Sequence, residues 1–550
     1  MELTDQDPLT LKKLPGSETS LEDFTEDSSR YGSFSSLQST DLVEDGNLGF
    51  YRNEVPQGRH LGVFSTIVLF VSRIIGSGIF AAPSSVYVGC GGNTAVFLAV
   101  YCSAAVMAFA GLYLFLEFGS LIPRSGGRKN FLEAAYTRPI RMMSVSFTTY
   151  TVLMGIAVSN AIVFGKYVLY GSGFDEEFVN NNSMACNYIG AALVICISLI
   201  HGYSVSTGIW VQNLLGGLKL VFALIISLSG IYAVAFYKRQ EGFSEIKTVE
   251  TLSLFQSHST ITISSLTTAF IQAFFCFAGW DSVHSVASEI KNPVRTLKIA
   301  GPLSLGFCLL CYLSLNVAYL KVFTYEEFKA AGPLAGSILF TRLLGENIGR
   351  KLITFGIALS AGSNLFVVVY STSRMNQECF KEGFLPFSKI MASNKPWGAP
   401  LYSSLLCAAL TTFWLLLLPS TGGAYSYLVA LEGYANQLVI LLVAVGLFIY
   451  RRKNRDEVAA IRASSVGVCA LIILSIYLLI GPFIGDQHEA SVKHLPSYPI
   501  AALLLIAVCI TFWLVKFVAL PKLQGYKLKR KLHIMDDGLV AIHWCKEYNL

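Results

Sequence analysis

Charged residues are scarce in this chain of 550 residues: Asp, Glu, Lys and Arg together make up 14% of the sequence, whereas hydrophobic residues make up 53%. Because a soluble globular protein carries about 25% charged residues, this composition excludes an ordinary soluble domain and predicts a protein with many membrane spans. The sequence also lacks an early, short apolar run followed by a cleavage site. We therefore expect no cleaved signal peptide.

The chain also lacks the residue sets that carry most enzyme chemistry. Its apolar stretches hold no Ser/His/Asp set, no paired catalytic carboxylates and no His-rich metal cluster. The 12 cysteines lie mostly in apolar stretches, where a thiol packs as a small hydrophobic group. We therefore expect no enzyme activity, no metal, no cofactor and no nucleic-acid partner.

Long apolar stretches are abundant, and they divide the chain into three parts. Residues 1–60 form an acidic, Ser/Thr-rich segment with little apolar content, which predicts a disordered tail. Residues 61–520 contain twelve runs of roughly the 20 residues that cross a bilayer, and residues 521–550 form a polar tail with a basic cluster. The predicted spans are 62–90, 93–122, 142–170, 188–203, 209–236, 263–289, 299–321, 347–373, 400–418, 422–450, 464–484 and 499–519.

Lysine and arginine are unevenly distributed between the loops, and this predicts the orientation. If the N-terminus is cytoplasmic, the basic loops, such as 123–141 and 451–462, lie inside, and loop 171–187, which has no Lys or Arg, lies outside. Basic loops stay in the cytoplasm, so we expect both termini to be cytoplasmic. The segment from Leu528 to Trp544 then either covers the cytoplasmic face or lies on the membrane.

The first predicted span contains the tetrapeptide Ile75-Gly76-Ser77-Gly78. Each glycine costs about 1 kcal/mol relative to alanine in a helix interior, and unwound backbone at membrane depth is tolerated only where protein or a water-filled cavity satisfies it. Unwinding here would place free N–H groups at the start of the following half-helix, which suits a carboxylate. The alternative is a face of small residues for helix packing.

A second glycine interrupts the sixth span, in Phe277-Ala278-Gly279. It lies at the position equivalent to the first break if the first ten spans form two five-span repeats. Interrupted spans at corresponding positions of two halves are the best sequence indication of a midplane binding site. Carbonyl groups freed around this second glycine would suit an ammonium, so the two breaks together predict a site for a zwitterion, an α-amino acid.

Lys219 is the only charged residue in the fifth apolar run. A charge inside the membrane is a functional candidate by default, and burial would lower its pKa toward neutrality, as a proton carrier requires. The alternative is a lysine whose stem is buried and whose ammonium reaches the cytoplasmic surface.

The other charged residues of the spans are candidates for structural ion pairs or for an inner gate. Arg73 lies just before the first break and needs a partner, for which Glu117 and Glu289 are candidates. Glu117 is also a candidate partner for a cytoplasmic arginine such as Arg124. Asp281 follows the second break and is a candidate latch for an inner gate.

Several of these motifs, read in order, resemble the amino acid–polyamine–organocation superfamily. The matching segments are Arg73–Phe80, Ile122–Gly127, Phe277–Trp280 leading to Glu289–Pro293, and Ser373-Arg374 with Gly383–Pro386. Within this superfamily the chain resembles the L-type amino acid transporters. It is most similar to their fungal relatives, the high-affinity methionine permeases, in Arg73 and in the stretch 123–133.

The resemblance implies an all-α, leucine-transporter-like fold: two inverted five-helix repeats plus two helices, with helices 1 and 6 broken. It implies that Ile75–Gly78 bind the substrate carboxylate, that the backbone of Phe277, Ala278 and Gly279 binds the ammonium, and that Phe277 is an aromatic gate. Lys219 matches the lysine that replaces a sodium site, which implies proton coupling or exchange rather than sodium symport. The segment Ser360–Phe366 departs from the L-type pattern, so side-chain selectivity is not transferred.

From these features we expect a plasma-membrane permease that imports methionine, and also cysteine, with the proton gradient by alternating access. The alternatives are a broader neutral amino acid transporter or exchanger, and a non-transporting sensor with the permease fold. We expect the lipid bilayer as its surroundings and no heavy-chain subunit, since Cys186 is interpreted as unpaired. Tails of the permeases that it resembles are ubiquitinated, so Lys12 and Lys13 are candidate sites for a ubiquitin ligase and its adaptor; the alternative is a solvated linker.

Overall fold

The computed structural model describes residues 59–76, 78–123, 125–181, 183–236, 255–417, 422–484 and 495–548. Lys12, Lys13, Ser77 and Arg124, which the sequence analysis names, lie outside the described residues. The first half of the described chain contains α1 (Val63–Ile74), α2 (Gly78–Ala81), α3 (Pro83–Gly89), α4 (Thr94–Leu121), α5 (Arg128–Ala135), α6 (Met142–Met154), α7 (Val158–Gly171), α8 (Glu176–Asn181), α9 (Ser183–Tyr203), α10 (Val205–Phe236), α11 (Ile263–Cys276) and the 3-10 helix η3 (Ser282–Glu289).

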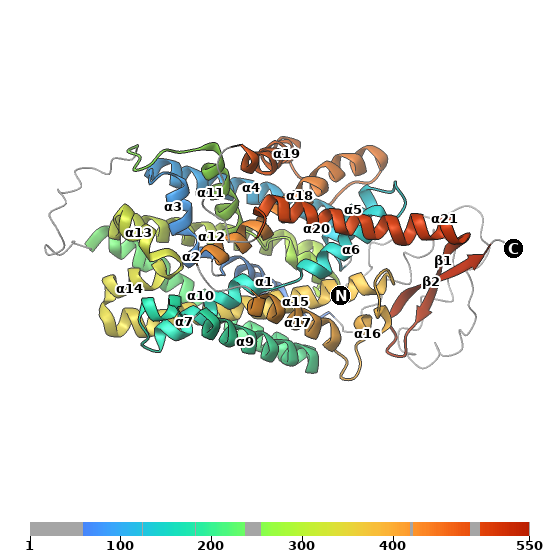
Figure 1. Ribbon diagram of the computed structural model, residues 1–550, viewed down its shortest axis with the longest axis horizontal. Helices are drawn as coiled ribbons and strands as arrows, with labels where there is room; N and C mark the ends of the chain where they lie inside the picture. The colour runs from blue at the N-terminus through green and yellow to red at the C-terminus, as the bar shows by residue number, and fades with distance from the viewer. Residues whose placement is uncertain are drawn as a thin grey trace, which may run out of the picture. The chain divides into compact units, whose positions relative to one another are not determined.

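The second half is also mainly helical and ends in a hairpin (Figure 1). It contains α12 (Pro293–Val322), α13 (Tyr325–Ala331), η4 (Gly332–Leu334), α14 (Ala335–Gly345), η5 (Glu346–Ile353), α15 (Thr354–Lys381), α16 (Ser388–Ala392), α17 (Leu401–Leu417), α18 (Gly422–Lys453), α19 (Ser465–Ile480), η6 (Gly481–Phe483), α20 (Tyr498–Trp513), η7 (Leu514–Ala519), α21 (Leu520–Gln524), β1 (Tyr526–Ile534) and β2 (Val540–Tyr548).

Ten helical stretches among the described residues are long and apolar enough to cross a membrane, which confirms a multi-pass helical membrane protein. Two shorter apolar helices, α11 and α17, lie where the sequence predicts the sixth and ninth spans. The count of twelve crossings and the inverted repeats stay predictions.

Local hydrogen bonds explain where several of these helices begin. The side chain of Asn93 accepts a hydrogen bond from Val96 N at the start of α4. At the start of α11, Thr262 and Ser265 form a capping box, in which each side chain bonds the backbone N–H of the other residue. Such caps satisfy backbone donors that the first helical turn leaves without a partner.

The structure contains both predicted breaks and a third that the sequence analysis does not predict. The first span is interrupted between Ile74 and Gly78, and the sixth ends as an α-helix at Cys276. The predicted third span, 142–170, is in fact divided into α6 and α7 by three non-helical residues from Gly155 to Ala157. A Cβ atom added at Gly155 would lie 3.0 Å from Cγ2 of Thr372, so glycine allows α15 to approach closely here.

The C-terminal hairpin packs against the end of α15. Strands β1 and β2 pair antiparallel, with Ile534 opposite Val540, and lie beyond α21 beside α16 in Figure 1. The Trp544 indole N–H donates to the Glu382 carbonyl at 2.8 Å, and the Asp537 carboxylate accepts from the Asn394 N–H at 2.7 Å. The hairpin therefore packs on the helix bundle, and its location relative to the membrane stays a prediction.

Candidate functional site

The first and sixth spans meet at their breaks. The Cys276 thiol, at the end of α11, lies 3.5 Å from the carbonyl oxygen of Gly78, the first residue of α2. A Cβ atom added at Gly78 would lie 3.3 Å from Cα of Cys276. Glycine is therefore what lets the two interrupted helices approach at this depth.

Tyr312 on α12 connects both breaks. Its hydroxyl lies 3.1 Å from the carbonyl oxygen of Ile74, the last residue of α1, and 2.7 Å from that of Cys276, the last residue of α11. A phenol has one hydrogen to donate, so it cannot fully satisfy two acceptors at once. An ammonium group, which has three donors, could satisfy both carbonyls. Tyr312 could not be identified from the sequence, because the residues around a tyrosine in an apolar span do not reveal which distant groups it contacts.

The end of α1 is held by an asparagine from α15. Asn364 donates from Nδ2 to the carbonyl oxygens of Ser72 and Arg73, at 2.7 and 2.8 Å. A Cβ atom added at Gly76 would lie 2.8 Å from that same Nδ2. The Gly76 N–H donates to Ile74 O at 3.0 Å, as part of the tight turn at the break.

Lys219 on α10 also binds the end of α1. Its ammonium donates to the carbonyl oxygens of Ser72, at 2.9 Å, and of Ser360 on α15, at 3.0 Å, and the side chain is buried. The group therefore lies inside the bundle rather than at the membrane surface. The hydroxyls of Ser360 and Ser363 are buried and have no hydrogen-bond partner within the part of the chain that the structure describes.

Aromatic rings cover the second break. The Phe277 ring is fully buried and lies 4.9 Å from the Tyr312 ring and 6.4 Å from the Tyr101 ring, measured between centroids. The Gly279 carbonyl, predicted to face an ammonium, instead accepts hydrogen bonds from the N–H and the hydroxyl of Ser282. The Cys276 carbonyl, in contrast, shares the Tyr312 hydroxyl with the Ile74 carbonyl of the first break.

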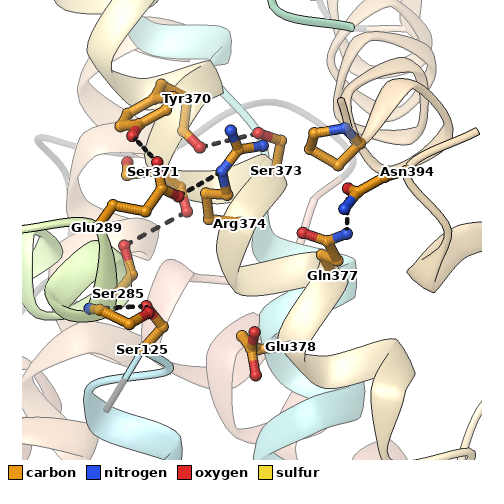
Figure 2. Close-up of polar contacts among 12 residues, drawn as sticks. Ser125, Ser285, Glu289, Tyr370, Ser371, Ser373, Arg374, Gln377, Glu378 and Asn394 are labelled. Atoms are coloured by element: carbon orange, nitrogen blue, oxygen red, sulfur yellow. Dashed lines mark hydrogen bonds and ion pairs between the residues drawn. The ribbon is translucent and has the colours of Figure 1, made fainter. Parts of the chain in front are cut away.

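Two predicted carboxylates after the second break form ion pairs. Asp281 pairs with Arg128 at the start of α5. Glu289 accepts from Nε of Arg374 at 2.7 Å and from the Tyr370 hydroxyl at 2.6 Å, and all three side chains are buried (Figure 2). Because Tyr370 and Arg374 both belong to α15, these bonds fasten the end of η3 to that helix.

The partners predicted for Arg73 are wrong, whereas Glu117 pairs with an arginine at one of the predicted basic loops, although not with Arg124. Glu117 binds Arg451 through two hydrogen bonds of 2.7 and 2.5 Å and also accepts from the backbone N–H of Ala463. Glu289 binds Arg374, so neither carboxylate is available to Arg73. These ion pairs could not be predicted from the sequence, because each joins residues that are far apart in the chain.

Arg73 instead packs against the second break. Gly279 has a backbone φ of +113°, and a Cβ atom added there would collide with Cγ of Arg73. Asp281 and Glu432 are the carboxylates whose charges act on the Arg73 guanidinium. Position 279 therefore requires glycine for two reasons: the backbone conformation there, and the arginine stem that lies against it.

Among the described residues, no group of three or more His, Cys, Asp or Glu side chains could hold a metal ion. The site is built from backbone carbonyls, amides, hydroxyls and one ammonium. Such groups can bind and release a small polar molecule.

Known proteins resemble this chain along most of its length. The family model described as amino acid permease matches residues 61–512. The low-affinity methionine permease of Saccharomyces cerevisiae is 51% identical over 522 residues, 94% of each chain, and the high-affinity methionine permease of the same yeast is 30% identical over 510 residues, 91% of this chain and 86% of the relative. The human b(0,+)-type amino acid transporter 1 is 25% identical over 444 residues, 78% of this chain and 83% of the relative. The resemblance to methionine permeases is confirmed, and the identity is higher with the low-affinity relative.

Proposed function

Because this chain belongs to the amino acid permease family, we propose that it imports methionine, and also cysteine, across the plasma membrane by alternating access. The family makes the protein a transporter of amino acids rather than an enzyme. Methionine is the substrate named for the relative that is 51% identical. A broader neutral amino acid transporter or exchanger is the second candidate, supported by the b(0,+)-type and large neutral amino acid transporters, which are 24–25% identical over 78% of this chain. A non-transporting sensor is the third.

The observation that carries the proposal is the convergence of two helix-end carbonyls, from Ile74 and Cys276, on the Tyr312 hydroxyl. These carbonyls suit the ammonium of an amino acid, and the start of α2 at Gly78 suits its carboxylate. In this proposal Phe277 closes over the bound substrate. The break thus binds the part common to all amino acids, and the side chain of the substrate is recognised elsewhere.

We propose proton coupling through Lys219. Its ammonium joins α1 to α15 through two carbonyls, and both bonds require a hydrogen on nitrogen directed at each acceptor. Loss of a proton removes the positive charge that strengthens both bonds, which weakens the connection between the two helices. The proton gradient would then bias which side of the site is open.

The remaining expectations concern the surroundings of the permease. We propose that both termini are cytoplasmic and that a ubiquitin ligase acts through an adaptor on Lys12 and Lys13, outside the described residues. We also propose that no heavy chain is attached. Cys186 supports this, because its thiol is buried and lies 3.7 Å from the carbonyl oxygen of Val179, where a partner's cysteine cannot reach it.

Uptake of labelled methionine into proteoliposomes that hold the purified permease tests the proposal. We expect accumulation that rises when the outside is made acidic, and competition by unlabelled methionine and cysteine. Lys219→Met should abolish the pH response, whereas the matched control Lys321→Met, at an exposed lysine, should retain it. Binding without uptake would favour a sensor, and equal competition by all neutral amino acids would favour the broader transporter.

A further inference from the structure

A cavity lies away from the helix breaks, between the end of the last span and the C-terminal hairpin. Its volume is about 770 Å³, and its walls come from η7, α16 and strands β1 and β2. Cavities of about 300–1,000 Å³ are typical of small-molecule sites. We propose that this cavity binds an anionic glycerophospholipid, with the phosphate headgroup among the basic side chains and part of an acyl chain along the apolar wall.

The charge of the lining selects an anion. Three lysines and two histidines line the cavity, Lys389, Lys516, Lys546, His533 and His543, and the lining includes no Asp or Glu. Lys389 and Lys546 are exposed at its edge. The nearest acidic residue of β2, Glu547, forms an ion pair with Lys529 at 3.2 Å instead.

The other wall of the cavity is apolar and continuous with a surface that faces lipid. Phe512, Val515 and Leu520 come from the last span, of which only 6% of the apolar window is buried within the protein. On the opposite side, Phe387 and Ile390 are 71% and 49% exposed. Apolar side chains this exposed, next to a helix embedded in the bilayer, fit an acyl chain better than water.

The combination of the two walls distinguishes a phospholipid from a soluble anion. A free phosphate or phosphorylated metabolite would use the lysines and leave the apolar wall in water. An uncharged lipid would use the apolar wall and leave the lysines without an anion. Trp513 and Lys522 flank this end of the span, and aromatic and basic residues are enriched where a helix leaves the bilayer. The headgroup region of a membrane therefore lies at the depth of the cavity.

Native mass spectrometry of the full-length permease tests this proposal. Protein released from nanodiscs of phosphatidylcholine mixed with phosphatidylserine should retain phosphatidylserine in preference. Near a membrane each lysine contributes about 1 kcal/mol toward anionic lipid, so Lys389→Gln/Lys546→Gln should reduce that preference about 25-fold. The matched control Lys527→Gln/Lys531→Gln changes two exposed lysines of β1 outside the lining and should keep the preference.

Three results would overturn the proposal. They are equal retention of both lipids, an equal loss in the control variant, and displacement of phosphatidylserine by soluble glycerophosphoserine, which would show a site for a free anion. If the double variant fails to fold, Lys389→Gln alone should reduce the preference about fivefold. Because retention is read without transport, this outcome is independent of the proposed substrate.

Discussion

Removal of the Tyr312 hydroxyl should lower the stability of the permease without substrate and raise its affinity for methionine. In Tyr312→Phe the ring contact with Phe277 at 4.9 Å remains, but the carbonyls of Ile74 and Cys276 lose the hydroxyl that they share. The Ile74 carbonyl keeps the hydrogen bond from the Gly76 N–H, whereas the Cys276 carbonyl loses its donor. A buried acceptor left without a donor costs about 1–3 kcal/mol. We therefore expect the unoccupied variant to be less stable by about that amount.

Substrate binding should reverse this loss, because the ammonium of methionine supplies the missing donors. The variant should then bind methionine about 5- to 150-fold more tightly, the factor that corresponds to the same 1–3 kcal/mol. The assay is thermal unfolding of purified protein with and without methionine, together with labelled-methionine binding. Weaker or unchanged binding in Tyr312→Phe would refute the idea that hydroxyl and ammonium share the same two carbonyls.

A matched control lies two turns further along α12. Tyr319 is fully buried, and its hydroxyl has no hydrogen-bond partner among the described residues. Tyr319→Phe removes the same atom from the same helix without depriving an acceptor. We expect no loss of stability and no gain in affinity, so a parallel effect in both variants would point to general loosening of α12.

Two further predictions concern ion pairs. Glu289→Gln should lower the stability by about 3–5 kcal/mol, because it leaves Arg374 buried without a counter-charge. Thermal unfolding should show that the double variant Glu289→Gln/Arg374→Gln recovers part of this stability. No recovery in the double variant would contradict the pairing. At Glu327, burial acts to raise the pKa, but hydrogen bonds from Arg342 and from the start of α13 outweigh it and lower the pKa from 4.5 to about 2. A carboxyl group whose pKa is lower in the folded than in the unfolded protein stabilises the fold at pH values above its unfolded pKa. The contribution of Glu327 should therefore be lost as the pH falls from about 4.5 toward 2. Glu327→Gln should reduce the acid dependence of unfolding in that window, whereas Glu326→Gln, its exposed neighbour, should not.

The sequence is informative where a function depends on the local backbone. Gly76 and Gly78 predict the first break and Gly279 predicts the second, because a glycine at membrane depth is costly unless unwinding or close approach requires it. At the third break, Gly155 lies against Thr372 of α15, a contact that the sequence of α6 does not contain. Side-chain partners such as Arg451 for Glu117 are likewise set by the packing of distant helices.

The hairpin is a different case, because a local signal for it was present. Segment 526–534 alternates polar and apolar residues in part, and Asp537-Gly538 precedes a second run rich in aromatic and β-branched residues. An Asp-Gly pair between two such runs is a strong indication of a β-hairpin. The local sequence therefore indicates the two strands, β1 and β2, that the structure contains.

α15 is the element that connects the two broken spans, and this constrains how the permease can open. Lys219 and Asn364 fasten the end of α1 to α15 through backbone carbonyls, and Arg374 fastens the end of η3 to the same helix through Glu289. The carbonyl bonds involve one ammonium and one amide, whereas the ion pair is buried and charged, and breaking it exposes two charges that are costly to leave unpaired. A motion that separates η3 from α15 must therefore break a buried ion pair, whereas a motion that separates α1 from α15 breaks the bonds of Lys219 and Asn364 to backbone carbonyls. From this difference we expect α1 to leave α15 before η3 does.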